Sequence, residues 1–130
     1  MIQPDPALRT MLAEAEWAVR PGRFAYLTLP EDDGRPAEAR ILEDEGVTLV
    51  VRVPEGAGAP GTEDTFGWIT LSVQTSLSAL GITAAMSSVL AEAGIPCNML
   101  AGYHHDHLLV PSADVERAVV VLTTAWTVER

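Results

Sequence analysis

The sequence predicts an α+β fold in which helices cover one face of an antiparallel sheet. The first observation is the order of patterns between Phe66 and Pro111, where a strand is followed by a helix and then by two more strands. The second is that helical stripes of apolar residues flank this unit on both sides. A right-handed crossover through the central helix lays that helix on one face of the sheet. We therefore expect at least four strands.

The first expected element is a helix. Asp5 suits its N-cap and Pro6 its first helical position. Apolar residues then recur at helical spacing as far as Val19, and Pro21-Gly22 is expected to end the helix. The segment Arg23–Leu29 is rich in β-forming residues and predicts a strand.

A hairpin and a linker follow. The segments Ala39–Leu42 and Val47–Val53 have strand character on either side of a turn that ends at Gly46. Residues 54–65 are rich in Gly, Pro and Ala and show no periodicity, which is typical of a linker. We predict an amino-terminal half over 1–57, a linker over 58–65 and a carboxy-terminal domain over 66–130.

The central unit opens with a strand whose polar and apolar residues alternate from Trp68 to Val73. After a loop, an apolar stripe predicts a helix from Ile82 to Ala93, and Gly94 suits its C′ position. Two short strands should follow, over 95–102 and 107–110, joined by a turn at residues 104–106.

The last expected element is a helix after Pro111. Ser112 suits its N-cap, and Asp114 and Glu116 are favourable near its positive end. Residues 119–124 are largely β-branched, which leaves a frayed end or a strand as alternatives. Little chain remains for a further strand, so we expect the amino-terminal segment to complete the sheet.

Composition excludes several classes of partner. The 130 residues carry a formal net charge of −10, which argues against nucleic acid and anionic membranes. The single cysteine, Cys97, precludes an internal disulfide and fits a reducing cytoplasm. The sequence shows no signal-peptide pattern and no apolar run of transmembrane length. We expect a cytoplasmic protein without nucleic-acid or membrane partners.

The run from Ser76 to Pro111, SLSALGITAAMSSVLAEAGIPCNMLAGYHHDHLLVP, resembles the second half of small bacterial ACT-domain proteins related to the CASTOR-type arginine sensors. The likeness is densest in LGITA, GIPCN and DHLLVP, and the upstream EDEGVTLVV is also similar. The resemblance implies a ferredoxin-like ACT architecture, with a βαββα core completed by an amino-terminal αβββ half that is a degenerate ACT-like unit. It also implies a non-catalytic regulatory protein that binds a small molecule, commonly an amino acid.

The candidate ligand site centres on Gly81, which stands between a loop and a helix. A glycine there lets a ligand approach, and the free N–H groups of the helix suit a carboxylate. An ordinary loop is the alternative, but ACT domains place amino-acid ligands at this loop, so the resemblance favours a site. The expected ligand-binding residues are Leu80, Gly81, Ile82, Thr83, Asn98, Asp106 and His107.

Three further points concern this site. Asp106 and His107 belong to DHLLVP, a segment that lines the ligand site in the arginine sensors, and Asp106 is the expected acceptor for an ammonium group. Ala79 stands where those sensors have an acidic residue, which counts against arginine itself as the ligand. Asn98 is expected either at an interface with a partner chain or as a sheet-surface amide.

The cluster His104-His105-Asp106-His107 suggests a second function, that of a metal-dependent enzyme. Strand alternation, however, points His105 and His107 to one face and His104 and Asp106 to the other. No other ligand group stands at metal-site spacing, so a hydrogen-bonded turn is favoured. The sequence also shows no nucleophile elbow, and we expect no enzyme, no metal and no cofactor.

We expect a homodimer, because a chain this short benefits from covering a sheet edge with a partner. The expected edge strands are Val47–Val53 and Ile95–Gly102. A purely structural dimer with a vacant site is a third alternative for the function.

Overall fold

The computed structural model describes residues 4–58, 64–73 and 80–127. In chain order its elements are α1 (Pro6–Glu14), β1 (Trp17–Leu29), β2 (Ala39–Glu43), β3 (Gly46–Val53), β4 (Phe66–Leu71), α2 (Ile82–Glu92), β5 (Asn98–Ala101), β6 (Asp106–Pro111), a 3-10 turn (Ser112–Asp114) and α3 (Val115–Thr124). No helix in these ranges is long and apolar enough to cross a membrane.

Six strands form one sheet in the order β2-β3-β1-β4-β6-β5, and each neighbouring pair is antiparallel. The prediction of an antiparallel sheet with at least four strands is confirmed. The amino-terminal strand β1 pairs with β4, so the first part of the chain extends the sheet of the second part, as expected. The division at residues 58–65 stays a prediction, since residues 59–63 lie outside the described ranges.

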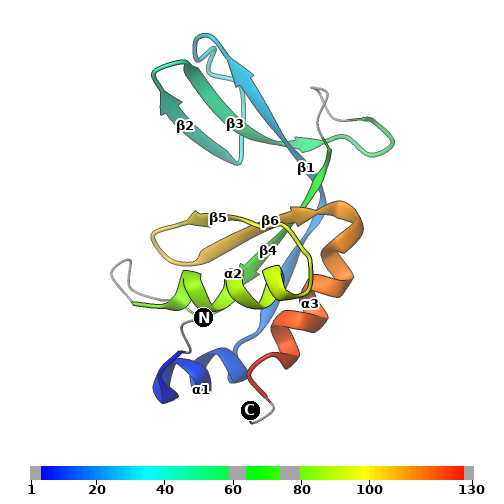
Figure 1. The fold of residues 1–130 in the computed structure, drawn as a ribbon. Helices are drawn as coiled ribbons and strands as arrows, with labels where there is room; N and C mark the ends of the chain where they lie inside the picture. Colours follow the sequence, from blue (N-terminus) through cyan, green and yellow to red (C-terminus); the bar gives the residue numbers. More distant parts are fainter. Residues whose placement is uncertain (1–3, 59–63, 74–79, 128–130) are drawn as a thin grey trace.

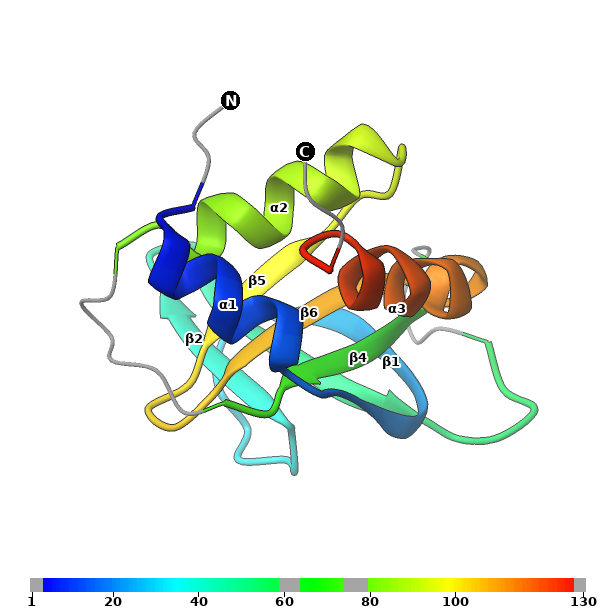
Figure 2. The same ribbon diagram turned by 90° about the horizontal axis from the view of Figure 1, so that it is seen from below.

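Helices α1, α2 and α3 lie on one face of the sheet (Figures 1 and 2). Alternation along β4 and β6 turns Ile69, Leu71, Leu108 and Val110 toward this face. They bury a continuous core with residues from all three helices, namely Leu12, Ile82, Ala85, Met86, Leu90, Ala118 and Leu122. This burial of apolar surface holds the helices on the sheet.

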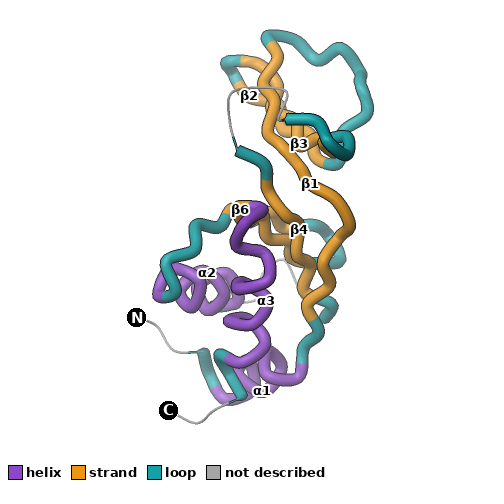
Figure 3. Tube along the Cα trace, turned by 90° about the vertical axis from the view of Figure 1, so that its right-hand side faces the viewer, coloured by secondary structure: helices purple, strands orange, loops and turns teal. Residues whose placement is uncertain are grey.

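The opposite face carries a smaller core where the sheet curls. Phe24, Val50, Trp68 and Leu109 are buried together there, one from each of the four central strands. The long strand β1 joins the two regions, because it runs from α1 up to the β2–β3 hairpin (Figure 3). The outer hairpin thereby turns back over the face that the helices leave open.

The first helix is shorter than predicted. Asp5 does cap it, accepting a hydrogen bond from the Leu8 N–H at 2.8 Å, but the helix ends at Glu14. The residues from Trp17 onward pair with β4 instead. The predicted stop at Pro21-Gly22 is an irregularity inside β1, where the register against β4 shifts and Gly22 has φ of +92°. Pairing with a distant strand outweighed the local helical pattern.

Of the two predicted edge strands, one is wrong and one is confirmed in a shorter form. The segment Val47–Val53 is not an edge, because β3 lies between β2 and β1. The predicted strand over 95–102 is an edge, but it is shorter than predicted and corresponds to β5. Ile95 does not belong to the strand, because its side chain is buried and its N–H donates a hydrogen bond to the Leu90 carbonyl at the end of α2, at 2.9 Å. The edges of the described sheet are therefore β2 and β5.

The carboxy-terminal segment is helical as far as Thr124, so its strand alternative is wrong. Ala118 and Leu122 are fully buried one helical turn apart, and this stripe outweighs the β-branched composition. Ser112 is not the N-cap, because it pairs with Thr65 through both its N–H and its hydroxyl, at 3.0 and 2.8 Å.

Candidate functional site

Gly81 begins α2 in the left-handed conformation, with φ of +91°, where a side chain would be strained. No side chain in the described ranges caps this helix, so its first N–H groups depend on the backbone, on solvent or on a ligand. Leu80 beside it is 93% exposed and Thr83 is exposed, whereas Ile82 is buried in the main core. Ala79, whose identity counts against arginine as the ligand, lies outside the described residues.

Asp106 begins β6 at the turn of the β5–β6 hairpin. This turn lies at the same end of the molecule as the start of α2 (Figures 1 and 2). By alternation Asp106 shares a face with Leu108 and Val110, which is the face that the helices cover. The structure thus brings Asp106 and the Leu80–Thr83 segment to one end and one face.

Asn98 and His107 belong to the other face. The His107 ring accepts a hydrogen bond at Nδ1 from the indole N–H of Trp68, at 3.1 Å, and lies 2.9 Å from the Thr70 hydroxyl. Asn98 alternates with Leu100, which packs against the smaller core, and is exposed. Two of the seven predicted site residues are therefore separated from Gly81 by the sheet.

The surroundings of His107 favour the neutral form of its ring by lowering its pKa. Burial is the main cause that lowers its pKa, and the nearby charges of His105 and Arg20 lower it further, whereas Asp106 opposes them. Because Nδ1 accepts from the indole, the proton of the neutral ring is on Nε2. The ring lies over Gly102, where an added Cβ would be 3.0 Å from Nε2. His107 is thus a fixed hydrogen-bond donor through Nε2.

His107 lines a cavity of about 450 Å³ on the open face of the sheet. Its walls come from both edge strands, β2 and β5, and from the centre of the sheet: Glu38, Ala39, Ile41, Trp68, Met99, Leu100, Ala101, Gly102 and His107. Sequence reasoning found only His107 among them. Ala39 and Leu100 come together only because the sheet curls. This curl cannot be predicted from the pattern of neighbouring residues in the sequence.

An ion pair and two packed aromatic rings hold residues of the cavity wall in place. Arg20 forms a salt bridge with Glu38, and its guanidinium carbon lies 4.6 Å from the centroid of the Trp68 ring. Trp68 in turn packs against Phe24, with centroids 5.3 Å apart. The position of Glu38 at the cavity wall is therefore fixed by a residue of β1.

A second cavity, of about 600 Å³, lies between the irregular part of β1, β4 and the start of α3. Its walls are mainly apolar, and its two arginines are engaged elsewhere. Arg23 donates to the carbonyls of Pro54 and Ala57, at 3.3 and 2.7 Å, and Arg20 pairs with Glu38. Few polar groups are left there to orient a ligand.

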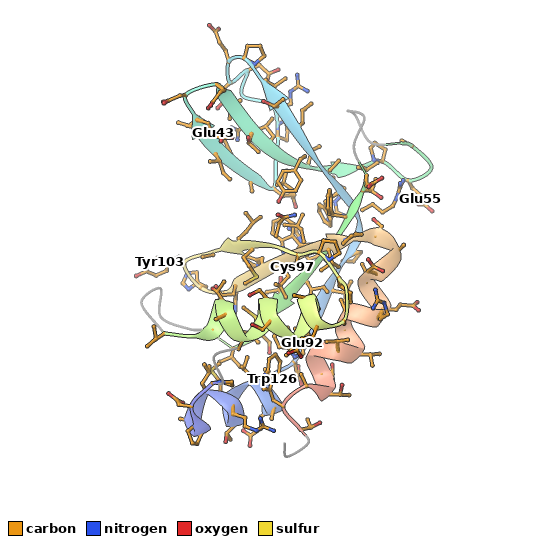
Figure 4. All side chains as sticks on the ribbon, viewed as in Figure 1. Glu43, Glu55, Glu92, Cys97, Tyr103 and Trp126 are labelled. Carbon is orange, nitrogen blue, oxygen red and sulfur yellow. The ribbon has the colours of Figure 1, made fainter. Side chains whose placement is uncertain are left out.

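The side chains of the histidine cluster take separate partners in the structure. His104 packs edge-on against Tyr103, with ring centroids 5.1 Å apart, and Figure 4 shows Tyr103 at the outer tip of the hairpin. His107 is bonded to Trp68 across the sheet. In the part of the chain that the structure describes, no three His, Cys, Asp or Glu side chains are placed to hold a metal ion. The geometry gives the metal-dependent enzyme no support there.

Cys97 packs against the main core, and burial raises the pKa of its thiol, which suits a core residue better than a nucleophile. The acidic loop after β1 is paired locally. The Asp33 carboxylate accepts hydrogen bonds from the Arg35 guanidinium, which lowers its pKa to about 2, and Asp32 forms a salt bridge with Arg40 at 2.9 Å.

Comparisons with known proteins bear on the family and the fold. Residues 65–124 match the family model of the ACT domain. The chain is similar to the crystal structure of VC0802 from Vibrio cholerae, which is described as a protein of unknown function and a possible transport protein. The two sequences are 31% identical, the TM-score is 0.72, and the match covers 89% of this chain and 94% of the other. It also has the fold of Atu0741 from Agrobacterium tumefaciens, at 21% identity and a TM-score of 0.62, over 86% and 89% of the two chains. No curated protein matches the chain.

Proposed function

This chain belongs to the same protein family as VC0802 and carries an ACT domain over residues 65–124, and we propose that it is a non-catalytic regulatory protein that binds an amino acid. The observation that carries the proposal is the start of α2. A left-handed glycine without a side-chain cap opens the helix inside the matched region, at the same end and face as Asp106.

The amino acid would bind by its two charged ends. Its carboxylate would meet the N–H groups at Gly81–Thr83, where the helix dipole favours an anion. Its ammonium would meet the Asp106 carboxylate, which supplies the opposite charge and accepts hydrogen bonds. His107 and Asn98 would not touch this ligand, because they lie on the other face.

The first test is a thermal-stability scan against each amino acid and against zinc. A ligand that binds the folded chain raises the melting temperature. We expect at least one amino acid to do so and zinc to have no effect. A shift with zinc alone would favour the metal-dependent enzyme, and the absence of any shift would favour a structural protein.

The second test locates the ligand. Asp106→Asn keeps the shape of the side chain but removes its charge, and we expect it to weaken the amino acid found in the scan by about 1.5–3 kcal/mol in calorimetric titration. Asp64→Asn is the matched control, because Asp64 is an exposed carboxylate before β4. Equal binding by wild type and Asp106→Asn would move the site elsewhere.

We also propose that the protein acts as a cytoplasmic homodimer. The outer edge of β2 is available for pairing in the described sheet, and on this strand the side chain of Leu42 is 76% exposed. Light scattering at increasing protein concentration tests this, and a mass that stays monomeric throughout would contradict it. A relation to the arginine sensors also remains a proposal.

A further inference from the structure

The cavity between β2 and β5 is lined by the edge strand β5 and by mainly apolar residues. We infer that it binds a short, extended, uncharged peptide segment, which pairs with the free edge of β5 and places small apolar side chains beneath β2. Trp68 and Leu100, which line this site, belong to the smaller core on the sheet face opposite the helices, so the inference is independent of the amino-acid site proposed above.

Where β5 lines the cavity, two of its residues contribute main-chain atoms rather than side chains. Met99 packs its side chain against the main core on the helix face, yet it lines the cavity on the other side of the strand. Ala101, two residues on, points the same way. These two residues therefore present backbone rather than side chains along the cavity wall.

The backbone groups of Met99 and Ala101 point away from β6. The Gly102 N–H bonds to the His105 carbonyl at 2.9 Å, so residues 102 and 105 form a hydrogen-bonded pair. Such pairs alternate in an antiparallel ladder, which makes Ala101–Asp106 and Met99–Leu108 the non-bonded pairs. Their N–H and C=O groups face the open edge, and no described strand lies beyond it. An extended peptide supplies matching groups at the same two-residue spacing.

The remaining walls favour an uncharged, mainly apolar occupant. Ala39 and Ile41 line the side of β2, with Trp68 and Leu100 between the two edges. The charge of Glu38 is compensated by Arg20. The volume of about 450 Å³ is in the usual range of roughly 300–1,000 Å³ for small ligands, which suits a few small residues rather than a long segment.

His107 adds one directed contact. Its Nε2–H is the ring donor that Trp68 and Thr70 leave unused, since both meet the ring at Nδ1. A peptide carbonyl is a suitable acceptor for this group. The neutral ring also avoids placing an isolated charge beside an amide ligand.

The probe is N-acetyl-Ala-Val-Ala-amide, titrated into the 130-residue protein while backbone and indole N–H signals are followed by NMR. We expect shifts at Met99, Ala101 and the Trp68 indole, with Leu80–Thr83 unaffected. The same peptide N-methylated at the amide of its third residue should bind roughly three- to tenfold more weakly, because one of the two donors that pair with β5 is lost.

Ala101→Pro removes the outward N–H without removing a bond to β6, so the sheet should survive, and binding should weaken by a similar factor. Ala101→Ser is its matched control, since it keeps the N–H and should bind as wild type does. A folded protein with no shifts at millimolar peptide would overturn the inference. So would shifts confined to residues 80–83, equal binding of the methylated peptide, or β5 signals that change only on dilution, which would indicate pairing with a second copy.

Discussion

The indole N–H of Trp68 on β4 donates a hydrogen bond to Nδ1 of His107 on β6, at 3.1 Å. This contact fixes the tautomer of the ring and places the neutral form in the folded state. If the His107 ring were doubly protonated, its Nδ1–H would point at the indole N–H of Trp68, and the hydrogen bond between them would be lost. The stability of the sheet should therefore depend on the charge of His107.

We expect the free energy of unfolding to fall as the pH is lowered through about 6.5, the ordinary pKa of histidine. Burial lowers the pKa of His107 in the folded state, so the unfolded chain takes up the proton first as the pH falls. The neutral His107 ring therefore makes its full contribution to the free energy of unfolding above the pKa that His107 has in the unfolded chain. This contribution is lost as the pH falls from there toward the lower pKa of the folded state. Urea unfolding at about pH 7.5 and about pH 5.5 measures it.

The control for this pH dependence is His107→Gln. Its amide oxygen can accept from Trp68, but it cannot titrate. His104 and His105 are present in both proteins, so the difference between the two profiles reports His107 and its electrostatic coupling to His105. Identical pH profiles would show that the ring of His107 does not contribute.

Gly102→Ala should destabilise the β5–β6 hairpin by about 1–3 kcal/mol, a typical cost of overpacking. The added Cβ would lie 2.9 Å from the His105 carbonyl oxygen and 3.0 Å from His107 Nε2. Gly58→Ala is the control, since no atom lies within 4 Å of its added Cβ. Urea unfolding gives the stabilities, and the Trp68 indole NMR signal reports whether the ring has moved. Equal costs for the two glycines would contradict this account.

Gly67→Ala should also cost about 1–3 kcal/mol, because its Cβ would fall 2.1 Å from Val115 Cγ2, where β4 meets α3. Val115→Ala removes the obstructing methyl groups. The double variant should therefore be less destabilised than the sum of the single variants, by about 0.5–3 kcal/mol. Strict additivity in a double-mutant cycle would show that α3 moves away from β4 instead.

Gly81→Ala should weaken binding of the amino acid found in the thermal scan, whereas Gly94→Ala should not. Both glycines are left-handed and lie at opposite ends of α2, with φ of +91° and +75°, so both substitutions impose a similar strain of about 1–2 kcal/mol. Only Gly81 lies at the proposed site. Calorimetric titration separates the two, and an equal loss in both would trace the effect to helix stability.

Local periodicity predicted the elements whose burial follows their own pattern. The stripe from Ile82 became α2, and Asp5 caps α1 as predicted, because both depend on neighbours within a few residues. The segment from Trp17 to Arg20 was assigned to the wrong element, because its pairing partner is about fifty residues away in β4. For the same reason, the sequence predicted only part of the candidate site. Gly81 has a local signature, whereas the separation of Asp106 from His107 follows from which face each residue occupies.

The sequence by itself determined the antiparallel, helix-covered sheet and the glycine that opens α2, since periodicity and backbone conformation are properties of short segments. Only the tertiary structure decided which strands are edges, because strand order depends on long-range pairing energies. It alone brought Ala39 and Leu100 into one cavity, because the curl of a sheet accumulates over all six strands.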